Sequence, residues 1–329
     1  MKKFIRLIAL FAGVTLLALS FASCSGKKTI RIGILQTAKH ASLDNCYEGL
    51  IQGLEEAGYK DGDNVEIDYQ NALGQPDSFQ QMAENMVGKK YDLVIGIATP
   101  TATALYAAAR GKDIPVIFCA VSDPVTPQLV NSLDNPGNNC TGSTDLLNLE
   151  GQLKMIRALQ PQAKKIGVLY NTAEPNSVTH LAELKKLAPT YQFEIVGKGI
   201  QSAADIPQTA ASLAAEVDCI NNFTDNLVVD NLSVVLEKAG TMNVPVYGSE
   251  IEQVKKGCLA SESLDYVKLG QETGKLAARV LQGEKAAEIP VARVKDSFPV
   301  INTDVAAKYN ITIPQAYASA EKVTTQADA

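Results

Sequence analysis

The chain has no tryptophan, only two histidines and few cysteines. No CxxC or other spacing typical of a metal site joins the cysteines. The sequence also lacks a GxSxG motif, a P-loop, a complete GxGxxG and a metal-binding pair of histidines. These absences disfavour the common hydrolase, nucleotide-binding and metalloenzyme classes, and we expect no cofactor and no metal. Free buried thiols and a single disulfide both remain open for five cysteines: Cys46, Cys119, Cys140, Cys219 and Cys258.

Long apolar runs are absent except at the N-terminus. A positively charged start over residues 2–6 precedes the apolar run 7–21, and Ala22-Ser23 leads into Cys24. A positive start, a short apolar run and small residues before the cut are typical of a secretory signal peptide. The cysteine in this place predicts a lipoprotein with a diacylglyceryl group on the Cys24 sulfur. A retained membrane anchor is the alternative, because the run is near the short end of a membrane span.

The sequence has no excess of positive charge. Its formal net charge is −6, and removal of the first 23 residues lowers it to −9. An acidic body is a poor partner for phosphate backbones, so nucleic-acid binding is not expected. The 306 residues that remain are enough for about two domains with cores of their own.

Strand-like runs alternate with helical patterns along this body. Residues 29–35 are rich in β-branched side chains, and residues 43–57 place apolar side chains at spacings of three and four, on one face of a helix. Further strands are predicted at 93–97 and 116–120, with an alanine-rich helix over 101–110 between them. Such alternation indicates βαβ units and parallel sheets covered on both faces.

The order of elements then repeats. Residues 32–35 (IGIL) are echoed by 166–169 (IGVL), and 114–116 (IPV) by 244–246 (VPV). The repeat predicts two Rossmann-like lobes with parallel sheets. We expect a signal peptide at 1–23, a lipidated tether at 24–28, a first lobe of 29–143 plus 263–288, and a second lobe of 144–262 plus 289–329 with a frayed tail from 318. The chain would cross a hinge three times, near Thr144, Ser263 and Glu288.

Several short segments carry a resemblance to a known family. They include Gly33-Ile34-Leu35-Gln36 with His40, Ile97-Ala98-Thr99-Pro100, Ala120-Val121-Ser122-Asp123-Pro124, Gly167-Val168-Leu169-Tyr170-Asn171, Thr224-Asp225-Asn226 and Ile311-Thr312-Ile313-Pro314. In this order they resemble the ABC-importer substrate-binding lipoproteins that include binders of tryptophan and other aromatic amino acids. The resemblance implies the type I periplasmic-binding-protein fold, in which two lobes close over a ligand.

The resemblance also implies a function and partners. It implies an extracytoplasmic component of an ABC importer that captures a small ligand, an amino acid and preferably an aromatic one. The implied partners are a membrane permease and its ATPase, and we expect a monomer held at the outer face of the cytoplasmic membrane by lipid on Cys24. Ser249-Glu250 and Ser261-Glu262-Ser263 depart from the pattern of the aromatic binders.

Candidate binding residues lie where predicted strands end, because ligands of parallel α/β sheets bind beyond the carboxyl ends of the strands. Thr99 is expected to cap the helix after one strand, with free N–H groups for a carboxylate. Asp225 is the candidate partner of a ligand ammonium, and Glu250 would strengthen that binding. The candidate set is Gln36, His40, Thr99, Pro100, Thr101, Ser122, Asp123, Asn171, Glu174, Asn176, Ser177, Thr224, Asp225, Asn226, Ser249 and Glu250.

Two other functions fit parts of the pattern. A protein of this kind could present its ligand to a sensor kinase, since the same closed state could dock either partner. His40, Asp123 and Asp225 could be acid–base groups of a cleft enzyme, but the missing catalytic motifs favour a protein that is not an enzyme.

Overall fold

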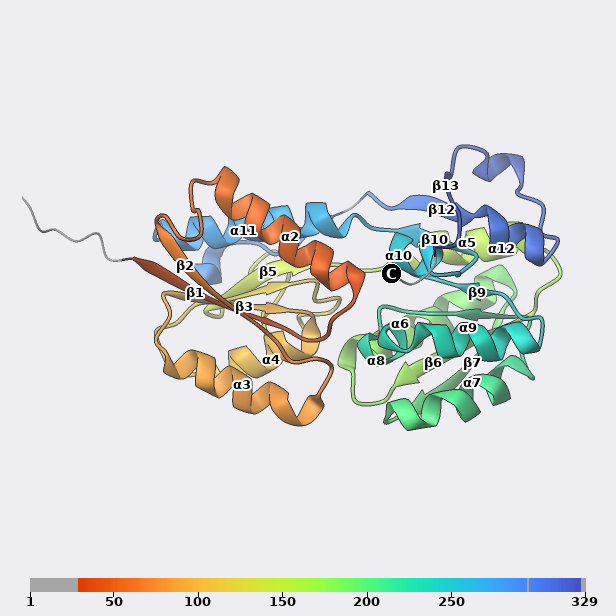
Figure 1. The fold of residues 1–329 in the computed structure, drawn as a ribbon, viewed down its shortest axis with the longest axis horizontal. Coiled ribbons are helices and arrows are strands. Elements are labelled where there is room, and N and C mark those ends of the chain that lie inside the picture. Colours follow the sequence, from red (N-terminus) through yellow and green to blue (C-terminus); the bar gives the residue numbers. More distant parts are fainter. Residues whose placement is uncertain (1–28, 295, 327–329) are drawn as a thin grey trace, which may run out of the picture. The chain divides into compact units, whose positions relative to one another are not determined.

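The computed structural model describes residues 29–294 and 296–326. The predicted signal peptide, the tether and the lipidation site Cys24 lie outside these residues. No helix in the described part of the chain is both long and apolar enough to cross a membrane. The described residues from Arg31 onward form one unit in which strands and helices alternate (Figure 1).

A six-stranded sheet is built mainly from the first half of the chain. Its strand order is β11-β5-β4-β3-β1-β2, and β1, β3, β4, β5 and β11 pair in parallel. Its strands are β1 (Ile30–Gln36), β2 (Val65–Asn71), β3 (Leu93–Ile97), β4 (Val116–Cys119), β5 (Cys140–Thr144) and β11 (Ala292–Arg293).

Helices cover both faces of this sheet, so its central strands are apolar on both sides. Every residue of β3 and β4 is buried. Met86 and Leu105 pack with Phe118 in one apolar cluster. One face carries α2 (Ala41–Glu56) and α11 (Tyr266–Leu281), and the other carries α3 (Pro76–Gly88) and α4 (Thr99–Ala109) (Figure 1).

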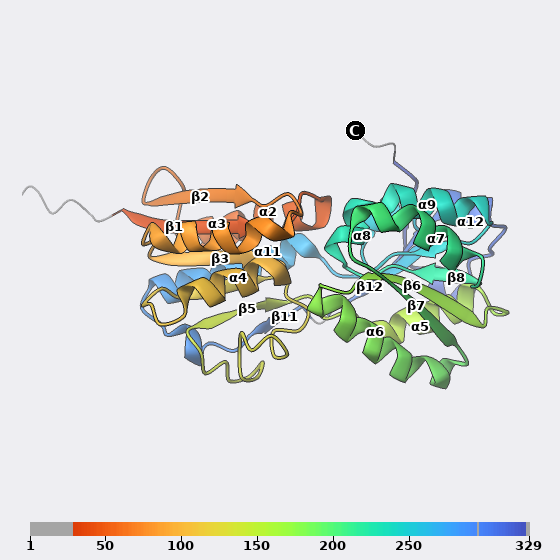
Figure 2. The same cartoon turned by 90° about the horizontal axis from the view of Figure 1, so that it is seen from below.

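A second parallel sheet has the order β7-β6-β8-β9. Its strands are β6 (Lys165–Asn171), β7 (Glu194–Ile200), β8 (Cys219–Asn221) and β9 (Val246–Tyr247). One face carries α5 (Leu149–Leu159) and α6 (Pro175–Leu187), and the other carries α7 (Ile206–Ala214), α8 (Asn226–Asp230) and α9 (Leu232–Thr241) (Figure 2).

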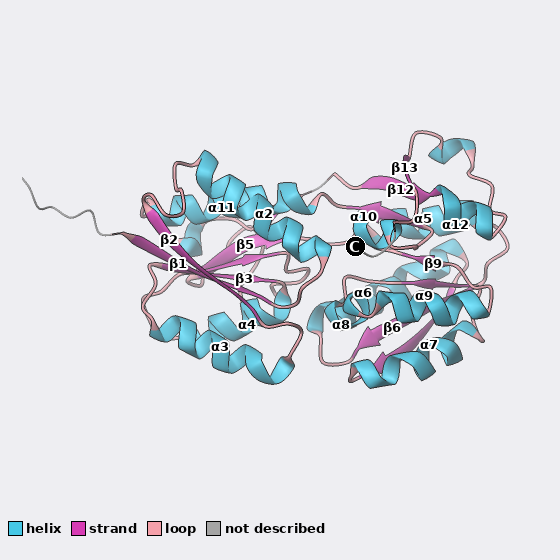
Figure 3. Cartoon of the chain, viewed as in Figure 1, coloured by secondary structure: helices cyan, strands magenta, loops and turns pink. Residues whose placement is uncertain are grey.

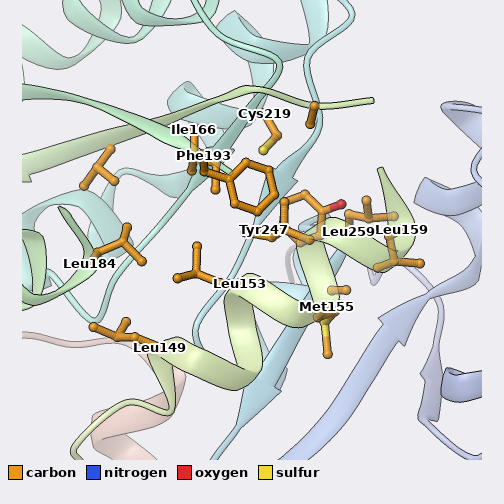
Figure 4. Close-up of a cluster of buried hydrophobic side chains, with 14 of the residues drawn as sticks. Leu149, Leu153, Met155, Leu159, Ile166, Leu184, Phe193, Cys219, Tyr247 and Leu259 are labelled. Atoms are coloured by element: carbon orange, nitrogen blue, oxygen red, sulfur yellow. The ribbon is translucent and has the colours of Figure 1, made fainter. Parts of the chain in front are cut away.

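This second sheet has cores of its own. Leu153 of α5 packs into the same apolar cluster as Ile166 and Tyr247 from the strands (Figure 4). A separate cluster on the opposite face joins α7 and α9 to the sheet. Burying each such side chain stabilises the fold by about 1.5–3 kcal/mol.

A small third sheet and short helices complete the chain (Figure 3). The sheet has the order β10-β12-β13, with β10 (Ala260–Ser263), β12 (Phe298–Asn302) and β13 (Glu321–Val323). The remaining helices are α10 (Ile251–Lys255) and α12 (Thr303–Lys308), with the 3₁₀ turns Ala188–Tyr191, Ala203–Asp205, Ala286–Glu288 and Gln315–Tyr317.

The predicted α/β fold with parallel sheets is confirmed, and two details of the prediction are corrected. β13 pairs with β12, and the Gln326 N–H donates to the Lys255 carbonyl at 2.8 Å, so residues 321–326 do not fray. β11 pairs with β5, so the residues just beyond Glu288 stay with the six-stranded sheet and the last crossing follows Arg293.

We therefore propose revised boundaries for the two lobes. The first lobe is the six-stranded sheet with its helices (29–144 and 264–294). The second lobe holds the other two sheets (145–263 and 296–326).

Candidate functional site

A cavity lies between the two lobes, beyond the carboxyl ends of β1, β3, β4 and β8. It encloses about 330 Å³, counting the solvent-filled space at its mouth. The first lobe contributes His40, Ser42, Leu43, Ala98, Thr99, Ala120, Ser122 and Tyr266, and the second contributes Asp145, Asn176, Thr224, Asn226, Val229 and Gln253.

Asp145 places a buried carboxylate in the cavity wall. It follows β5 and is 3% exposed. Its Oδ1 accepts a hydrogen bond from the Ser122 hydroxyl, and its Oδ2 accepts one from the Tyr266 hydroxyl, both at 2.8 Å. Burial raises the pKa of Asp145, whereas the two hydroxyl donors lower it, and no cation of the described residues contributes. The wall therefore offers a carboxylate that only neutral donors satisfy, which suits a cationic group on a ligand.

Glu174 organises the start of α8 from the loop after β6. Its Oε2 accepts hydrogen bonds from the Asn226 backbone N–H at 3.0 Å and from Asn226 Nδ2 at 2.7 Å. Its Oε1 accepts one from the Leu227 N–H at 3.2 Å. These are N–H groups that the first turn of a helix leaves without an intrahelical partner. Burial, and next the charge of Asp225, raise the pKa of Glu174 to about 7.

His40 connects this cluster to the first lobe. Its Nε2 lies 3.4 Å from Asn226 Oδ1 across the cavity. Burial lowers the pKa of His40 to about 4, so the ring is neutral at pH 7. His40 Nδ1, Asn176 Oδ1 and Thr224 Oγ1 have no hydrogen-bond partner within the described part of the chain. All three residues line the cavity. Buried polar atoms are usually hydrogen-bonded, so these three atoms are candidates for contact with whatever occupies the cavity.

Two helices of the first lobe begin at the cavity wall, namely α2 after His40 and α4 after Ala98. Ala98 has a left-handed φ of +74° and is the N-cap of α4. Thr99, expected as this cap, is instead the first residue inside the helix, and Ala98 provides no side-chain cap. At the start of α4, Pro100 has no N–H, the Thr101 N–H donates to Thr37 Oγ1 at 3.3 Å and the Ala102 N–H donates to the Ala98 carbonyl at 3.1 Å. The Thr99 N–H and the first N–H groups of α2 are therefore the ones placed to favour an anion such as a carboxylate.

Six of the sixteen candidate residues line the cavity and ten do not. The six are His40, Thr99, Ser122, Asn176, Thr224 and Asn226. The ten that do not line it are Gln36, Pro100, Thr101, Asp123, Asn171, Glu174, Ser177, Asp225, Ser249 and Glu250. Most of the ten make hydrogen bonds within the protein. Thr101, for example, bonds Thr37 Oγ1 at 2.9 Å and the Ile97 carbonyl at 2.9 Å.

Asp225, expected to pair with a ligand ammonium, is used by the protein itself. Its Oδ2 accepts a hydrogen bond from the Asn171 N–H at 2.6 Å, and its Oδ1 accepts one from the Val228 N–H at 3.1 Å. The side chain is fully buried. Asp225 therefore caps α8 and ties it to the end of β6.

Asp123 joins the lobes at a second point. Its Oδ1 accepts from the N–H groups of Val125 and Thr126 at 3.0 and 3.1 Å. Its Oδ2 accepts from the Thr179 hydroxyl of the second lobe at 3.3 Å. Asp123 is therefore a turn-capping residue that also bridges the lobes.

The two glutamates that depart from the aromatic-binder pattern are absent from the cavity lining. Glu250 accepts hydrogen bonds from the N–H groups of Glu252 and Gln253 at 2.7 and 2.9 Å and so caps α10. Glu262 lies on β10 and accepts one from the Ser297 hydroxyl at 3.1 Å. The two departures from the aromatic-binder pattern therefore lie outside the residues that line the cavity.

Sequence reasoning missed eight wall residues, of which Asp145 and Tyr266 matter most. Asp145 immediately follows a strand, which is the signal that identified the other candidates, but it lies next to the hinge crossing expected near Thr144 and is absent from the candidate set. Tyr266 opens a helix 121 positions later, and no local pattern connects it to the site. The other missed residues are Ser42, Leu43, Ala98, Ala120, Val229 and Gln253.

Comparison with protein families gives one match that spans nearly all of the described chain. The family is described as "ABC transporter substrate binding protein", and its model matches residues 31–324. The chain is also 42% identical over 278 residues to the tyrosine-binding protein of Clostridioides difficile strain R20291, covering 84% of this chain and 80% of that protein.

Two solved structures carry further information. A Streptococcus ABC domain in complex with L-Trp matches with a TM-score of 0.87 at 37% identity, covering 90% of this chain and all of that one. The ligand-free, open structure of an adhesive substrate-binding protein from Clostridium difficile matches with a TM-score of 0.69 at 36% identity and the same coverage.

Proposed function

This chain belongs to the family of ABC transporter substrate-binding proteins, and from that premise we propose that it captures an aromatic amino acid between its lobes for import. The family inferred from sequence resemblance is thereby confirmed. The amino-acid proposal is supported by a tyrosine-binding relative and by a structural neighbour in complex with L-Trp. Ligand-driven closure of two lobes then provides the signal that a permease reads.

The buried carboxylate of Asp145 is the observation that carries the proposed ligand class. A carboxylate at 3% exposure with two neutral donors is costly unless a cation completes it. The ammonium of an amino acid supplies that cation. The first N–H groups of α2 and the Thr99 N–H of α4 suit the ligand carboxylate. Leu43 and Val229 form an apolar part of the wall for the ligand side chain.

The delivery route is proposed from the sequence of the N-terminus. Cys24 would carry the diacylglyceryl group after cleavage, and two acyl chains hold a protein firmly at a membrane. The protein would then act as a monomer at the outer face of the cytoplasmic membrane, with a permease and its ATPase as partners.

Isothermal titration calorimetry on the full-length protein, purified in mild detergent and refolded to remove carried-over ligand, tests the proposal. We expect micromolar or tighter binding of L-tyrosine or L-tryptophan. N-acetyl-L-tyrosine, which lacks the ammonium, should bind at least 100-fold more weakly. If none of the twenty amino acids binds to refolded protein, the proposed function is wrong.

Asp145→Asn tests the ammonium assignment, with Asp77→Asn as the matched control. Asp77 is exposed in the first turn of α3, away from the cavity lining, and its substitution changes the net charge equally. We expect Asp145→Asn to weaken the binding of L-tyrosine more than tenfold, and Asp77→Asn to leave the affinity unchanged. Equal affinities of the two variants for L-tyrosine would show that Asp145 does not bind the ligand ammonium. That result would not contradict the amino-acid ligand itself.

A further inference from the structure

Two amide side chains near the cavity are oriented by one carboxylate. The Asn226 amide donates through Nδ2 to Glu174 Oε2 at 2.7 Å. When Glu174 is ionised, a reversed amide would place its oxygen against the carboxylate, and two acceptors would face each other without a proton. Asn226 Oδ1 therefore points away from Glu174, toward His40 Nε2 at 3.4 Å.

This orientation sets the tautomer of His40. Because Asn226 Oδ1 can only accept, His40 Nε2 must carry the hydrogen. In the neutral ring the other nitrogen, Nδ1, then has a lone pair and no hydrogen. Nδ1 has no partner among the described residues, so it is an acceptor left for the contents of the cavity.

Asn176 repeats the arrangement from the neighbouring loop. Its Nδ2 lies 3.5 Å from Glu174 Oε2 and 3.4 Å from the Thr224 carbonyl oxygen, which are both acceptors. Its Oδ1 is buried and without a partner in the described structure. The side chain is 3% exposed and lines the cavity. The wall therefore offers two uncharged acceptors, one from each lobe.

We infer that His40 Nδ1 and Asn176 Oδ1 form a subsite that requires a hydrogen-bond donor on the side chain of the ligand. This inference rests on the proposed amino-acid ligand, whose ammonium is assigned to Asp145. Two neutral acceptors match a neutral donor, such as a phenol O–H or an indole N–H. Phenylalanine has no such donor and would leave both buried acceptors unpaired, so the site should select tyrosine or tryptophan and reject phenylalanine.

Calorimetry with L-tyrosine, L-tryptophan and L-phenylalanine on the full-length protein is the first test. We expect phenylalanine to bind about 10–100-fold more weakly than the better of the other two, as for a site built to receive a donor. The tyrosine and tryptophan titrations distinguish a phenol from an indole. Phenylalanine affinity within threefold of both would overturn the subsite while leaving the proposed function intact, whereas no binding of any amino acid would refute the proposed function itself.

His40→Leu and the matched control His180→Leu separate the acceptor from general packing. His180 is also a buried neutral histidine without a hydrogen-bond partner in the described chain, but it packs against Phe223 and does not line the cavity. His40→Leu should reduce the ratio of affinities for the preferred ligand (tyrosine or tryptophan) and for phenylalanine at least tenfold. His180→Leu should leave this ratio unchanged. A preference unaffected by His40→Leu contradicts the inference.

Nitrogen-15 NMR of histidine-labelled wild-type protein gives a readout that leaves His40 unsubstituted. The chain has two histidines, and His180→Leu assigns their signals. We expect His40 Nδ1 to show the shift of an unprotonated nitrogen in the free protein and to move when the preferred ligand is added, but not when phenylalanine is added. A protonated Nδ1 in the free protein would overturn the tautomer and the subsite with it.

Discussion

Tyr266 donates its phenolic hydrogen to Asp145 Oδ2 at 2.8 Å, although the two residues are 121 positions apart in the chain. Asp145 follows β5, where the chain leaves the six-stranded sheet, and Tyr266 begins α11, where the chain returns to it. The bond therefore fixes the charged group of the cavity between two of the segments that connect the lobes.

Tyr266→Phe should make ligand binding more sensitive to acid. Burial already raises the pKa of Asp145, and the Tyr266 hydroxyl is one of the donors that lower it. Loss of this donor raises the pKa further. Protonated Asp145 is neutral and no longer attracts the ammonium, so affinity falls on acidification and begins to fall at a higher pH in the variant. Titration of L-tyrosine by calorimetry from pH 8 to pH 4.5 measures the shift, and identical pH profiles would contradict it.

Asp225→Ala should lower stability without affecting recognition of the ligand ammonium. The variant loses acceptors for the N–H groups of Asn171 and Val228, which should lower the free energy of unfolding by about 2 kcal/mol. Urea denaturation measures this loss. The preference for L-tyrosine over N-acetyl-L-tyrosine should persist in Asp225→Ala and fall in Asp145→Asn. If the preference instead fell in Asp225→Ala and persisted in Asp145→Asn, Asp225 would be the partner of the ligand ammonium.

Glu250→Gln should change how stability depends on pH. Burial raises the pKa of Glu250 from 4.5 to about 7, so the folded protein binds its proton more tightly than the unfolded chain does. The stability from this group is fully present below pH 4.5 and is lost as the pH rises through 7, a change of about 3 kcal/mol. Glutamine does not titrate, so the variant should gain stability relative to wild type by about this amount between pH 4.5 and 8. Urea denaturation at both pH values tests it, and parallel profiles would show that Glu250 does not titrate in this range.

Gly53→Ala should destabilise the first lobe because α2 and α11 touch through their backbones. A Cβ at Gly53 would overlap the Gln271 carbonyl oxygen of α11. Forcing the helices apart should cost about 1–3 kcal/mol, the usual range for overpacking. Gly88→Ala is the control, since nothing lies within 4 Å of its Cβ position. Urea denaturation should show a loss for Gly53→Ala alone, and equal effects of the two substitutions would contradict the close packing.

The candidate site could be located from the sequence, but its wall could not be assigned. Asn176 and Thr224 were found because polar residues after apolar strands collect at one edge of a parallel sheet. The same rule also selected Asp225 and Glu174, which the fold uses to cap α8. A carboxylate after a strand can face a ligand or a helix start, and the choice depends on neighbours that are distant in sequence.

The sequence by itself determined the α/β architecture and the repeated plan of two parallel sheets, because hydrophobic periodicity and strand–helix alternation are local properties. The family followed from the resemblance of short segments to known members. Tertiary structure decided which side chains are left without partners. β11 pairs with β5 at the edge of the six-stranded sheet. Asp145 and Tyr266 come into contact because the chain leaves the first lobe after β5 and returns to it at α11. A binding site consists of polar groups that the fold does not satisfy, and such groups can be identified only after all the other hydrogen bonds have formed.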